Sequence, residues 1–440
     1  MILRGGRVID PANNRDAVGD VRIENGTIAE IGESLSVRED ETVNDCAGKV
    51  VCPGLIDIHV HLREPGQEYK EDLNSGLSAA AAGGFTGVAC MPNTRPVIDE
   101  EAIVRDLTVR SQAVNSARLY VIAALSKGMA NQELAEMAYL KDAGAVAVSD
   151  DAFQVQDAEF MRRAMEYAKM LSLPVLAHCE NTRLTEGGAM NEGYTATILG
   201  IKGLPREAYE IDVARNSLLS LMTGCHLHIL HVSTAREVEM IRFWKRQGAN
   251  VTAETAPHYW CLTDEACRGY NTNAKMNPPL RTEADCVAII EGLKDGTLDC
   301  IATDHAPHAG YEKQQEFVLA PFGITGLETS LALGITHLVK PGHLSLSDLI
   351  RRMSTEPARV LNLPGGSLTV GQPADITIFD PDTEWTVNPE QFLSKGKNTP
   401  FAGQTLTGKT VQTIVGGNIA FSYLSPPPFS GEGAGGRGSL

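Results

Sequence analysis

The stretch Gly54-Leu-Ile-Asp-Ile-His59-Val-His61-Leu-Arg63-Glu-Pro-Gly66 is the most informative part of this chain of 440 residues. It begins with an apolar run typical of a buried strand and contains two histidines one residue apart. In an extended chain, positions two apart point to the same face, so His59 and His61 can direct two imidazoles to one point. Two neutral imidazoles on a rigid element are a plausible start of a transition-metal site. Alternatively, the two histidines merely lie close together in a surface loop.

Seven further apolar runs, separated by helical patterns, follow this first strand. Helical patterns cover residues 132–141 and 157–171, among others. Eight strand-like runs over about 300 residues predict an α/β fold, a (β/α)8 TIM barrel with its chemistry at the carboxyl ends of the strands. The predicted strands are Leu55–His59, Gly87–Cys90, Leu119–Ala123, Ala145–Val148, Val175–Ala177, Leu227–Leu230, Asn250–Ala253 and Asp299–Ala302.

The sequence pattern at both ends of the chain differs from that of the middle. Short alternating runs flank Asn25-Gly26, which is a strong hairpin signal. Similar runs return at Ala374–Phe379 and Thr410–Gly417. We therefore predict a small β-sandwich domain built from residues 1–52 and 365–424, a barrel over 53–364, and a flexible Pro- and Gly-rich tail over 425–440.

Polar side chains gather where the predicted strands end, and eight of the chain's 11 histidines lie on these strands or just past their ends. Strand parity sorts the candidates further. In His226-Leu-His228-Ile-Leu-His231 the first two histidines share one face and His231 lies on the other. We assign His231 to the barrel axis and expect His226 and His228 to be structural residues between sheet and helix. His305 directly follows Asp304, so in an extended chain its side chain points to the opposite face, and we leave it out of the ligand set.

These strand ends predict five metal ligands, enough for one or two divalent metals: His59, His61, His178, His231 and Asp304. Asp151 is the carboxylate best placed to bridge two metals, although a helix N-cap or turn role is open for it. For His178 a packing role is the alternative.

Composition excludes several classes of partner. Lys and Arg number 38 against 55 Asp and Glu, a net charge of −17. This argues against nucleic acid and anionic membranes as partners, but a small anionic substrate needs only one local arginine. No apolar run is long enough for a membrane span. The nine scattered cysteines include no CxxC pair, which favours reduced thiols in a cytoplasmic protein.

Together these residues resemble the amidohydrolase superfamily of metal-dependent hydrolases and, within it, the dihydroorotases. The resemblance spans nearly the whole chain except the tail. It rests on the opening stretch and on four later motifs, which are Met91-Pro-Asn93-Thr94, Asn277-Pro-Pro-Leu-Arg281, Thr303-Asp304-His305-Ala-Pro-His308 and Gly366-Ser-Leu-Thr-Val-Gly-Gln-Pro-Ala-Asp375.

The resemblance implies zinc, one or two ions per subunit, and the reversible interconversion of L-dihydroorotate and N-carbamoyl-L-aspartate in pyrimidine biosynthesis. A metal-bound hydroxide would be the nucleophile and Asp304 the general acid/base. Many relatives bridge two metals through a carboxylated lysine after strand 4. Here Ala145-Val-Ala-Val-Ser149-Asp-Asp151 offers no lysine, so the chain is similar to the branch that has an aspartate there.

Arginine binds carboxylates through two parallel hydrogen bonds, so we expect Arg63 to anchor the substrate carboxylate. A solvated loop charge is the alternative for Arg63. The resemblance adds Asn93 and His308 to this anchor, and Asn277 with Phe322 and Gly323 to recognition of the ring amide.

Two other functions stay open at this point. The first is another cyclic-amide hydrolase, such as an allantoinase or a hydantoinase, with the same metal ligands but without the carboxylate anchor. The second is an inactive subunit of aspartate carbamoyltransferase, which should have lost metal ligands. We expect a homodimer, and the sequence leaves association with aspartate carbamoyltransferase open.

Overall fold

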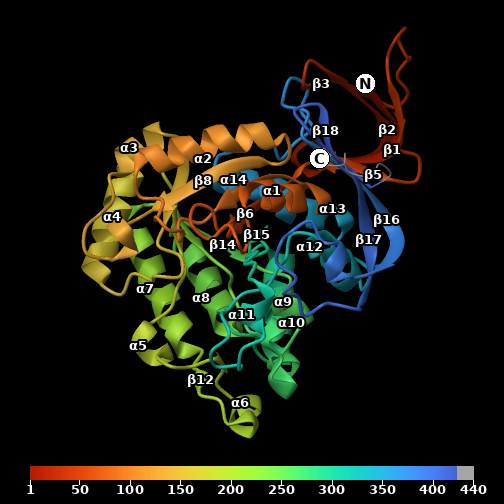
Figure 1. Cartoon of the computed structure of the whole chain (residues 1–440). Helices are drawn as coiled ribbons and strands as arrows, with labels where there is room; N and C mark the ends of the chain where they lie inside the picture. Colours follow the sequence, from red (N-terminus) through yellow and green to blue (C-terminus); the bar gives the residue numbers. More distant parts are fainter. Residues whose placement is uncertain (424–440) are drawn as a thin grey trace, which may run out of the picture.

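The computed structural model describes residues 1–423, and its centre is a barrel of eight parallel strands (Figure 1). The predicted tail, residues 425–440, lies outside the described residues. All eight predicted strands are present, in the order in which they follow one another along the chain. They are β6 (Leu55–Val60), β7 (Phe85–Cys90), β8 (Arg118–Ala124), β9 (Ala145–Ser149), β10 (Val175–Ala177), β13 (Leu227–Ile229), β14 (Val251–Thr255) and β15 (Cys300–Ile301).

The barrel closes between its first and last strands. Val60 and His305 form a parallel bridge, and the backbone N–H of His61 donates to the carbonyl oxygen of His305 at 2.8 Å. This contact joins the end of β6 to the residues just past β15, so the two most distant motifs of the barrel become neighbours.

Side chains alternate between the barrel interior and the surrounding helices. Ile122 and Leu176, for example, share the interior apolar cluster, whereas Val121 and Val175 pack in the outer cluster with the helices. Strand β6 departs from this alternation, because its pairing with β7 shifts register between Asp57 and Val60. An irregularity of this kind next to an active site re-aims the side chains that follow it.

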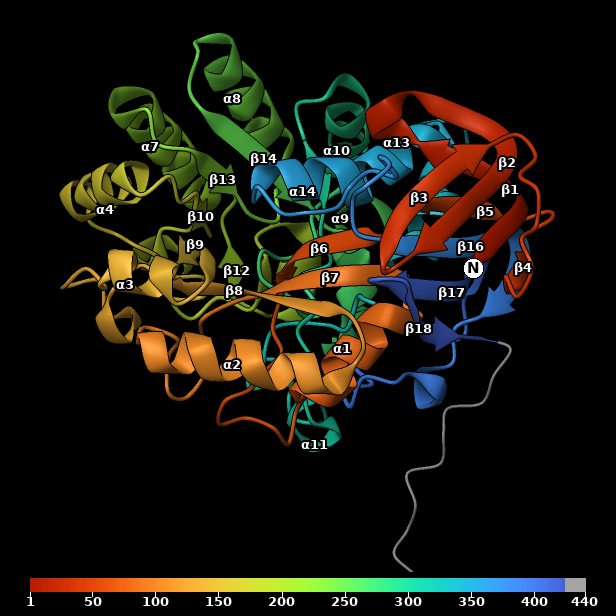
Figure 2. The same cartoon turned by 90° about the horizontal axis from the view of Figure 1, so that it is seen from above.

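Helices cover the outside of the barrel (Figure 2). The pattern over 157–171 forms α4 (Ala158–Met170), as predicted, with Asp157 accepting from the backbone N–H of Phe160 as its N-cap. The pattern over 132–141 becomes helical only at Met137, because Leu134 forms a β-bridge to Ser126. The other helices that cover the barrel wall are α1 (Leu73–Ala82), α2 (Glu101–Val114), α3 (Met137–Asp142), α7 (Glu207–Thr223), α8 (Ala235–Arg246) and α10 (Glu283–Asp295).

Shorter elements complete the barrel. Those that follow strand ends lie together on the lower side of Figure 1: α5 (Thr182–Thr185), α6 (Tyr194–Leu199), the two-stranded sheet of β11 (Met190–Asn191) and β12 (Gly203–Leu204), α9 (His258–Cys261) and α11 (Gly310–Lys313). The last helices are α12 (Ser330–Gly334), α13 (Leu346–Ile350) and α14 (Glu356–Val360).

A second sheet combines the two ends of the chain, as the sequence predicts. Its strands run in the order β18-β17-β16-β5-β1-β2-β3, with β4 beside β1. They are β1 (Ile2–Asp10), β2 (Arg15–Glu24), β3 (Thr27–Gly32), β4 (Val43–Asp45), β5 (Val50–Pro53), β16 (Ile376–Thr386), β17 (Thr405–Val415) and β18 (Asn418–Ser422). The domain boundaries at 52/53 and 364/365 stay predictions.

This sheet curls on itself, so that both of its ends enclose one apolar core. The β2–β3 hairpin and the β17–β18 hairpin are far apart in strand order, yet Ala374 links them. Its N–H donates to Gly26 O at 2.8 Å and its carbonyl accepts from Gly417 N at 3.0 Å. The enclosed core includes Ile28 of β3 and Ile414 of β17. The β-sandwich expected from the sequence is therefore one continuous curled sheet.

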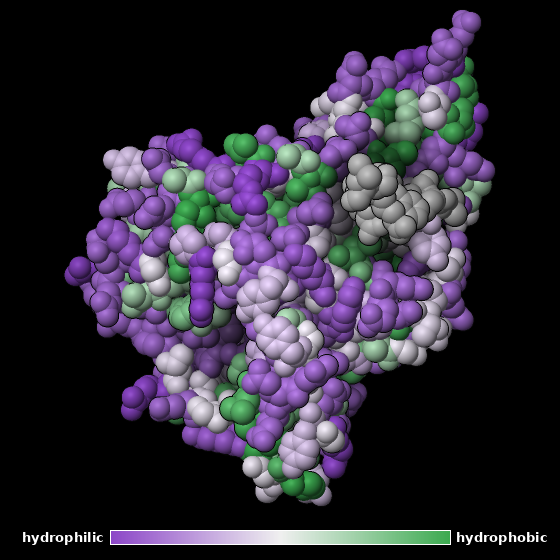
Figure 3. Space-filling view, in the orientation of Figure 1, coloured by the Kyte–Doolittle hydropathy of each residue, from purple (hydrophilic) through white to green (hydrophobic). Residues whose placement is uncertain are grey.

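Hydrophilic side chains cover most of the face shown in Figure 3, in keeping with the acidic composition. Among the described residues no helix combines the length and the apolar character that crossing a membrane requires.

The buried hydroxyl of Thr377 is one of several polar contacts that join the curled sheet to the barrel, beside the hydrogen bond from Thr413 Oγ1 to Ala81 O at 2.7 Å. Thr377 of β16 donates to Gly84 O at 2.5 Å and accepts from the N–H of Leu55 at 3.2 Å. We predict that Thr377→Val lowers the free energy of unfolding by about 1 to 2 kcal/mol, because the shape is kept while two buried hydrogen bonds are lost. Urea unfolding measures the effect, with Thr386→Val on an exposed part of β16 as control. Equal stability of both variants would contradict the fastening role.

Candidate active site

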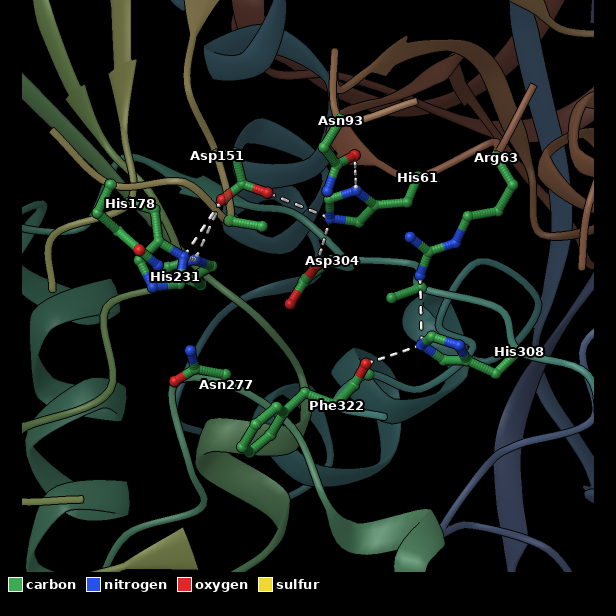
Figure 4. Close-up of a pocket in the computed structure, with 14 residues that line it drawn as sticks. His61, Arg63, Asn93, Asp151, His178, His231, Asn277, Asp304, His308 and Phe322 are labelled. Atoms are coloured by element: carbon green, nitrogen blue, oxygen red, sulfur yellow. Dashed lines mark hydrogen bonds and ion pairs between the residues drawn. The ribbon is translucent and has the colours of Figure 1, made fainter. Parts of the chain in front are cut away.

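A cavity of about 230 Å³ opens at the carboxyl ends of the barrel strands (Figure 4). Every site residue predicted from the sequence lines it, except His59, which is fully buried beside it. The lining residues are His61, Arg63, Asn93, Asp151, Ala152, Gln154, His178, His231, Asn277, Asp304, Ala306, His308, Phe322 and Gly323.

Asp151, just past β9, lies between two groups of histidines. Its Oδ2 is 3.7 Å from His59 Nε2 and 3.4 Å from His61 Nε2. Its Oδ1 is 3.2 Å from His178 Nδ1 and 3.8 Å from His231 Nε2. Each carboxylate oxygen therefore faces a different pair of imidazoles.

Asp304 joins the first of these groups. Its Oδ1 lies 3.2 Å from His61 Nε2 and 3.5 Å from His59 Nε2. Burial alone would raise the pKa of Asp304, but the neighbouring His59 and His61 lower it to about 2. The carboxylate is therefore ionised near neutral pH and able to accept a proton.

The donor set fits divalent metal ions. His59, His61 and Asp151 can offer one ligand atom each within 4.8 Å of one another, and so can Asp151, His178 and His231. His59 Nε2 is buried and makes no hydrogen bond within the described residues. Nitrogen and carboxylate donors in this number are those that zinc takes in proteins. A buried, unpaired imidazole nitrogen aimed at carboxylates is the arrangement that a cation would satisfy.

Hydrogen bonds fix the orientation of three of these imidazoles. Glu254 Oε1 lies 2.6 Å from His59 Nδ1, Asn93 Oδ1 lies 2.9 Å from His61 Nδ1, and Glu180 Oε2 lies 2.9 Å from His178 Nε2. Each contact takes the ring nitrogen that faces away from Asp151. Carboxylates behind metal-binding imidazoles set the tautomer and raise the basicity of the free nitrogen.

Electrostatics at His59 also favour a cation. Burial alone would lower its pKa, but the carboxylates of Asp304 and Glu254 outweigh this and raise the pKa well above its usual value. At Asp151, burial opposes ionisation, yet the contacts with His178, His231 and His59 hold the pKa well below its usual range. A metal ion would compete with protons for these nitrogens, so its binding would release protons.

Strand parity explains part of this arrangement and fails at His231. The backbone there has a φ of 35°, in the left-handed region, which turns the side chain toward the cavity although Leu230 already faces the interior. His228 also faces the barrel interior. It pairs in register with Leu176 and contacts Glu254 Oε2 at 3.1 Å.

The prediction that His226 and His228 lie between sheet and helix is therefore wrong, since both bond the same hydroxyl of Thr252. Their structural role is nevertheless in keeping with these contacts. His305 packs away from the cavity against Glu71 and the N–H of Gly326, as parity predicts.

The other side of the cavity carries positive charge. Arg63 is buried and donates through Nε to Pro307 O at 3.2 Å, and its Nη2 lies 3.4 Å from His308 Nε2. Burial lowers the pKa of Arg63 to about 10, so the group stays charged near neutral pH. Within the described residues it forms no ion pair with a carboxylate. A buried guanidinium without an anion is poised to bind one.

His308 is held as a neutral imidazole beside this arginine. Burial and then the charges of Arg63, Lys70 and Lys313 lower its pKa to about 2. Its Nε2 lies 2.8 Å from Phe322 O, and its Nδ1 lies 3.4 Å from Lys70 Nζ. The network assigns the proton to Nε2, which donates to Phe322 O, while Nδ1 accepts from the ammonium.

Asn277 lies in the cavity wall with both ends of its side chain engaged. Its Oδ1 accepts from Tyr209 OH at 2.6 Å, and its Nδ2 donates to Glu180 Oε2 at 2.8 Å. Glu180 also accepts from Gln154 at 3.1 Å. The residue predicted to recognise the substrate is thus linked to the carboxylate behind His178.

Sequence reasoning missed the residues that hold others in place: Glu254, Glu180, Tyr209 and Lys70. Glu180 shares the strand parity of His178, two residues before it, and this is a signal that could have found it. Glu254 is the next-to-last residue of the seventh barrel strand, and a carboxylate at the carboxyl end of a barrel strand is a candidate for the site.

Comparisons with known proteins agree with this geometry. A family profile described as "Dihydro-orotase-like" matches residues 48–237, and one described as "Amidohydrolase family" matches residues 288–421. A dihydroorotase from Acetivibrio thermocellus is 49% identical over 419 residues, 95% of this chain and 98% of that protein. One from Syntrophus aciditrophicus is 51% identical over 422 residues, 96% and 99% of the two chains.

The chain belongs to the dihydroorotase family of the amidohydrolases. It is accordingly an enzyme, a cyclic-amide hydrolase.

Among solved structures, the chain is similar to the L-hydantoinase (dihydropyrimidinase) from Arthrobacter aurescens. The TM-score is 0.86 at 26% identity, with 95% of each chain covered. The D-hydantoinase from Thermus sp. has a TM-score of 0.81 at 24% identity, with 96% of this chain and 95% of that one covered, and shows the shared fold. The dihydroorotase family thus shares its barrel with other cyclic-amide hydrolases.

We predict that Glu254→Gln weakens metal binding about 10- to 100-fold, because it removes the carboxylate behind His59. Metal content after dialysis against a series of chelator concentrations measures the loss. Glu239→Gln, on the exposed face of α8, is the control and should keep the affinity of the unaltered protein. Unchanged affinity in Glu254→Gln would show that the carboxylate does not support His59.

Proposed function

We propose that this enzyme interconverts L-dihydroorotate and N-carbamoyl-L-aspartate reversibly, in the biosynthesis of pyrimidines. The observation that carries the proposal is the buried, charged Arg63, which has no carboxylate partner within residues 1–423 and lies in a cavity whose opposite wall holds the predicted metal ligands. A cyclic amide that carries a carboxylate can bind both walls, with its carboxylate at Arg63 and its amide at the metal ligands. The strong similarity to dihydroorotases supports the same assignment.

Substrate orientation follows from the two walls. The fork of Arg63 would take the carboxylate, with Asn93 and the neutral His308 as its neighbours in the wall. Asn277 and the backbone of Phe322 and Gly323 would border the ring amide. Gly323 is suited to close approach, because its φ is 119° and an added Cβ would lie 2.6 Å from the Cβ of Ala306.

Zinc is the metal we propose, with His59, His61, Asp304, His178 and His231 as ligands and Asp151 as the bridge between two ions. The support is that the two oxygens of Asp151 face separate histidine pairs. A divalent metal bound there supplies Lewis-acid polarisation of the ring carbonyl and acidifies water toward neutral pH.

Asp304 is the residue we propose for proton transfer. Its pKa of about 2 keeps it ionised, so in the hydrolytic direction it can take the proton of the attacking water and deliver it to the leaving ring nitrogen. In the biosynthetic direction the same carboxylate would take the proton from the carbamoyl nitrogen. Its backbone φ of 49° turns the side chain toward His61 just past the end of β15.

We further propose a cytoplasmic location, which the nine free cysteines support, since oxidising compartments favour disulfides. A homodimer stays a prediction, and so does association with aspartate carbamoyltransferase. Nothing in the described site favours an inactive subunit, because all predicted ligands are present and converge.

The decisive experiment assays the purified protein, with its metal content quantified, on dihydroorotate, carbamoyl-aspartate, hydantoin and allantoin. We expect turnover of the first two. Activity on hydantoin with none on dihydroorotate would instead support a hydantoinase, which the similarity to the L-hydantoinase structure favours as the second candidate. In the same assay, Arg63→Ala should lose most turnover of dihydroorotate with metal content unchanged. Loss of metal from that variant would contradict the anchoring role.

Metal stoichiometry tests the bridge. We predict two zinc ions per chain in the unaltered protein and at most one in Asp151→Asn, because an amide offers one oxygen where the carboxylate offers two. Elemental analysis after dialysis measures the ratio, with Asp142→Asn at the exposed end of α3 as control. A single ion in all three proteins would mean that Asp151 does not bridge.

A further inference from the structure

Two lysines beside the active site are buried. Lys275 lies two residues before Asn277, and Lys313 is the last residue of α11. Their exposed fractions are 3% and 5%. Within the part of the chain that the structure describes, neither forms an ion pair with a carboxylate. A buried ammonium is costly unless hydrogen bonds satisfy it, so the contacts of these groups show what holds them.

Lys275 donates only to backbone carbonyl oxygens of one loop. Its Nζ lies 2.7 Å from Phe317 O, 3.1 Å from Val318 O and 2.6 Å from Ala320 O. The same nitrogen lies 4.5 Å from the centre of the Phe322 ring, within the range of a cation–π contact. All three ammonium hydrogens therefore have an acceptor, and an aromatic face lies beside them.

Lys313 makes a second set of hydrogen bonds to backbone carbonyl oxygens. Its Nζ lies 2.9 Å from Pro321 O, 3.0 Å from Gly323 O and 3.3 Å from Lys275 O. The carbonyl of Lys275 also accepts from the N–H of Gly323 at 3.0 Å. The two lysines, which we name the lysine clamp, thus connect the segment that leads to Asn277 with the segment that contains Phe322 and Gly323.

The clamp compensates for a lack of regular structure. Residues 314–323 form no helix or strand, so their carbonyl groups have no ladder of backbone partners. Buried carbonyl groups need hydrogen bonds, and two ammonium groups supply them for five of the residues from Phe317 to Gly323. Within residues 1–423 no carboxylate occupies the clamp. Burial lowers the pKa of Lys275 to about 8 and, together with the charge of Lys275, that of Lys313 to about 7, so near neutral pH Lys275 is mostly charged and Lys313 only partly so.

We infer that Lys275 and Lys313 are positioning residues that hold the backbone of Phe322 and Gly323 against the substrate pocket. This inference rests on the proposed function for its substrate, but its structural part concerns the loop alone. Phe322 O in turn accepts from His308, the neighbour of Arg63. Loosening the loop should therefore weaken substrate binding far more than it affects the metal ligands.

The test combines hydrogen exchange with kinetics on the metal-loaded, full-length protein. In Lys313→Met we expect amide exchange across residues 317–323 to accelerate about tenfold or more. The reason is that losing the free energy of one charge-assisted hydrogen bond changes the equilibrium for local opening by about tenfold or more. We expect KM for dihydroorotate to rise about tenfold, kcat to stay within about threefold, and metal content to stay constant. Lys294→Met, at an exposed site on α10, is the control.

Should Lys313→Met fail to fold, Lys313→Gln and Lys275→Gln test the inference by the same measurements. The glutamine amide keeps two hydrogen-bond donors, so these variants disturb the buried site less. Unchanged exchange in the loop of folded variants would overturn the inference, and so would a fall in kcat with KM unchanged. If the unaltered protein does not act on dihydroorotate, the proposed function fails, while faster exchange confined to residues 317–323 would still support the clamp.

Discussion

Closure of the barrel is the constraint on which the site depends. The hydrogen bond from His61 N to His305 O joins the ends of the first and last strands, which lie more than 200 residues apart in the chain. It places His61 Nε2 3.2 Å from Asp304 Oδ1. The other ligands come from strands that pair with one another in a fixed register, and the closing contact adds Asp304 to them. A barrel left open at this seam would still hold Asp151, His178 and His231 together, but it would separate Asp304 from His61.

The cavity divides its charges between two walls. One wall gathers imidazoles and carboxylates, and the opposite wall carries Arg63, with Lys70 and the lysine clamp behind it. In a chain with a net charge of −17, this concentration of buried cations is a local departure from the overall composition. The mutual effect of the cations is visible at His308, whose pKa they help to lower to about 2. A neutral imidazole can then sit beside a guanidinium without repelling it.

Sequence reasoning predicted the barrel, its eight strands and the residues of the cavity, because periodicity and strand ends are local signals. It was less successful where the backbone leaves the extended conformation. Parity misplaced His228, since the left-handed backbone of His231 lets both histidines serve the interior. The predicted helix over 132–141 lost its first residues to a bridge with Ser126. No sequence pattern indicated the lysine clamp, because its hydrogen-bond acceptors are backbone carbonyl groups, which every residue possesses.

Both walls leave buried groups that the chain alone does not satisfy. His59 Nε2 has no partner in the described residues, and Arg63 has no carboxylate there. Each such group costs stability in the folded chain, and the cost is removed when a ligand of opposite character binds. The site is thus maintained by the barrel around it, whose apolar layers are largely independent of metal or substrate. Stability and recognition are therefore supplied by different residues, and this separation lets closely similar barrels act on different cyclic amides.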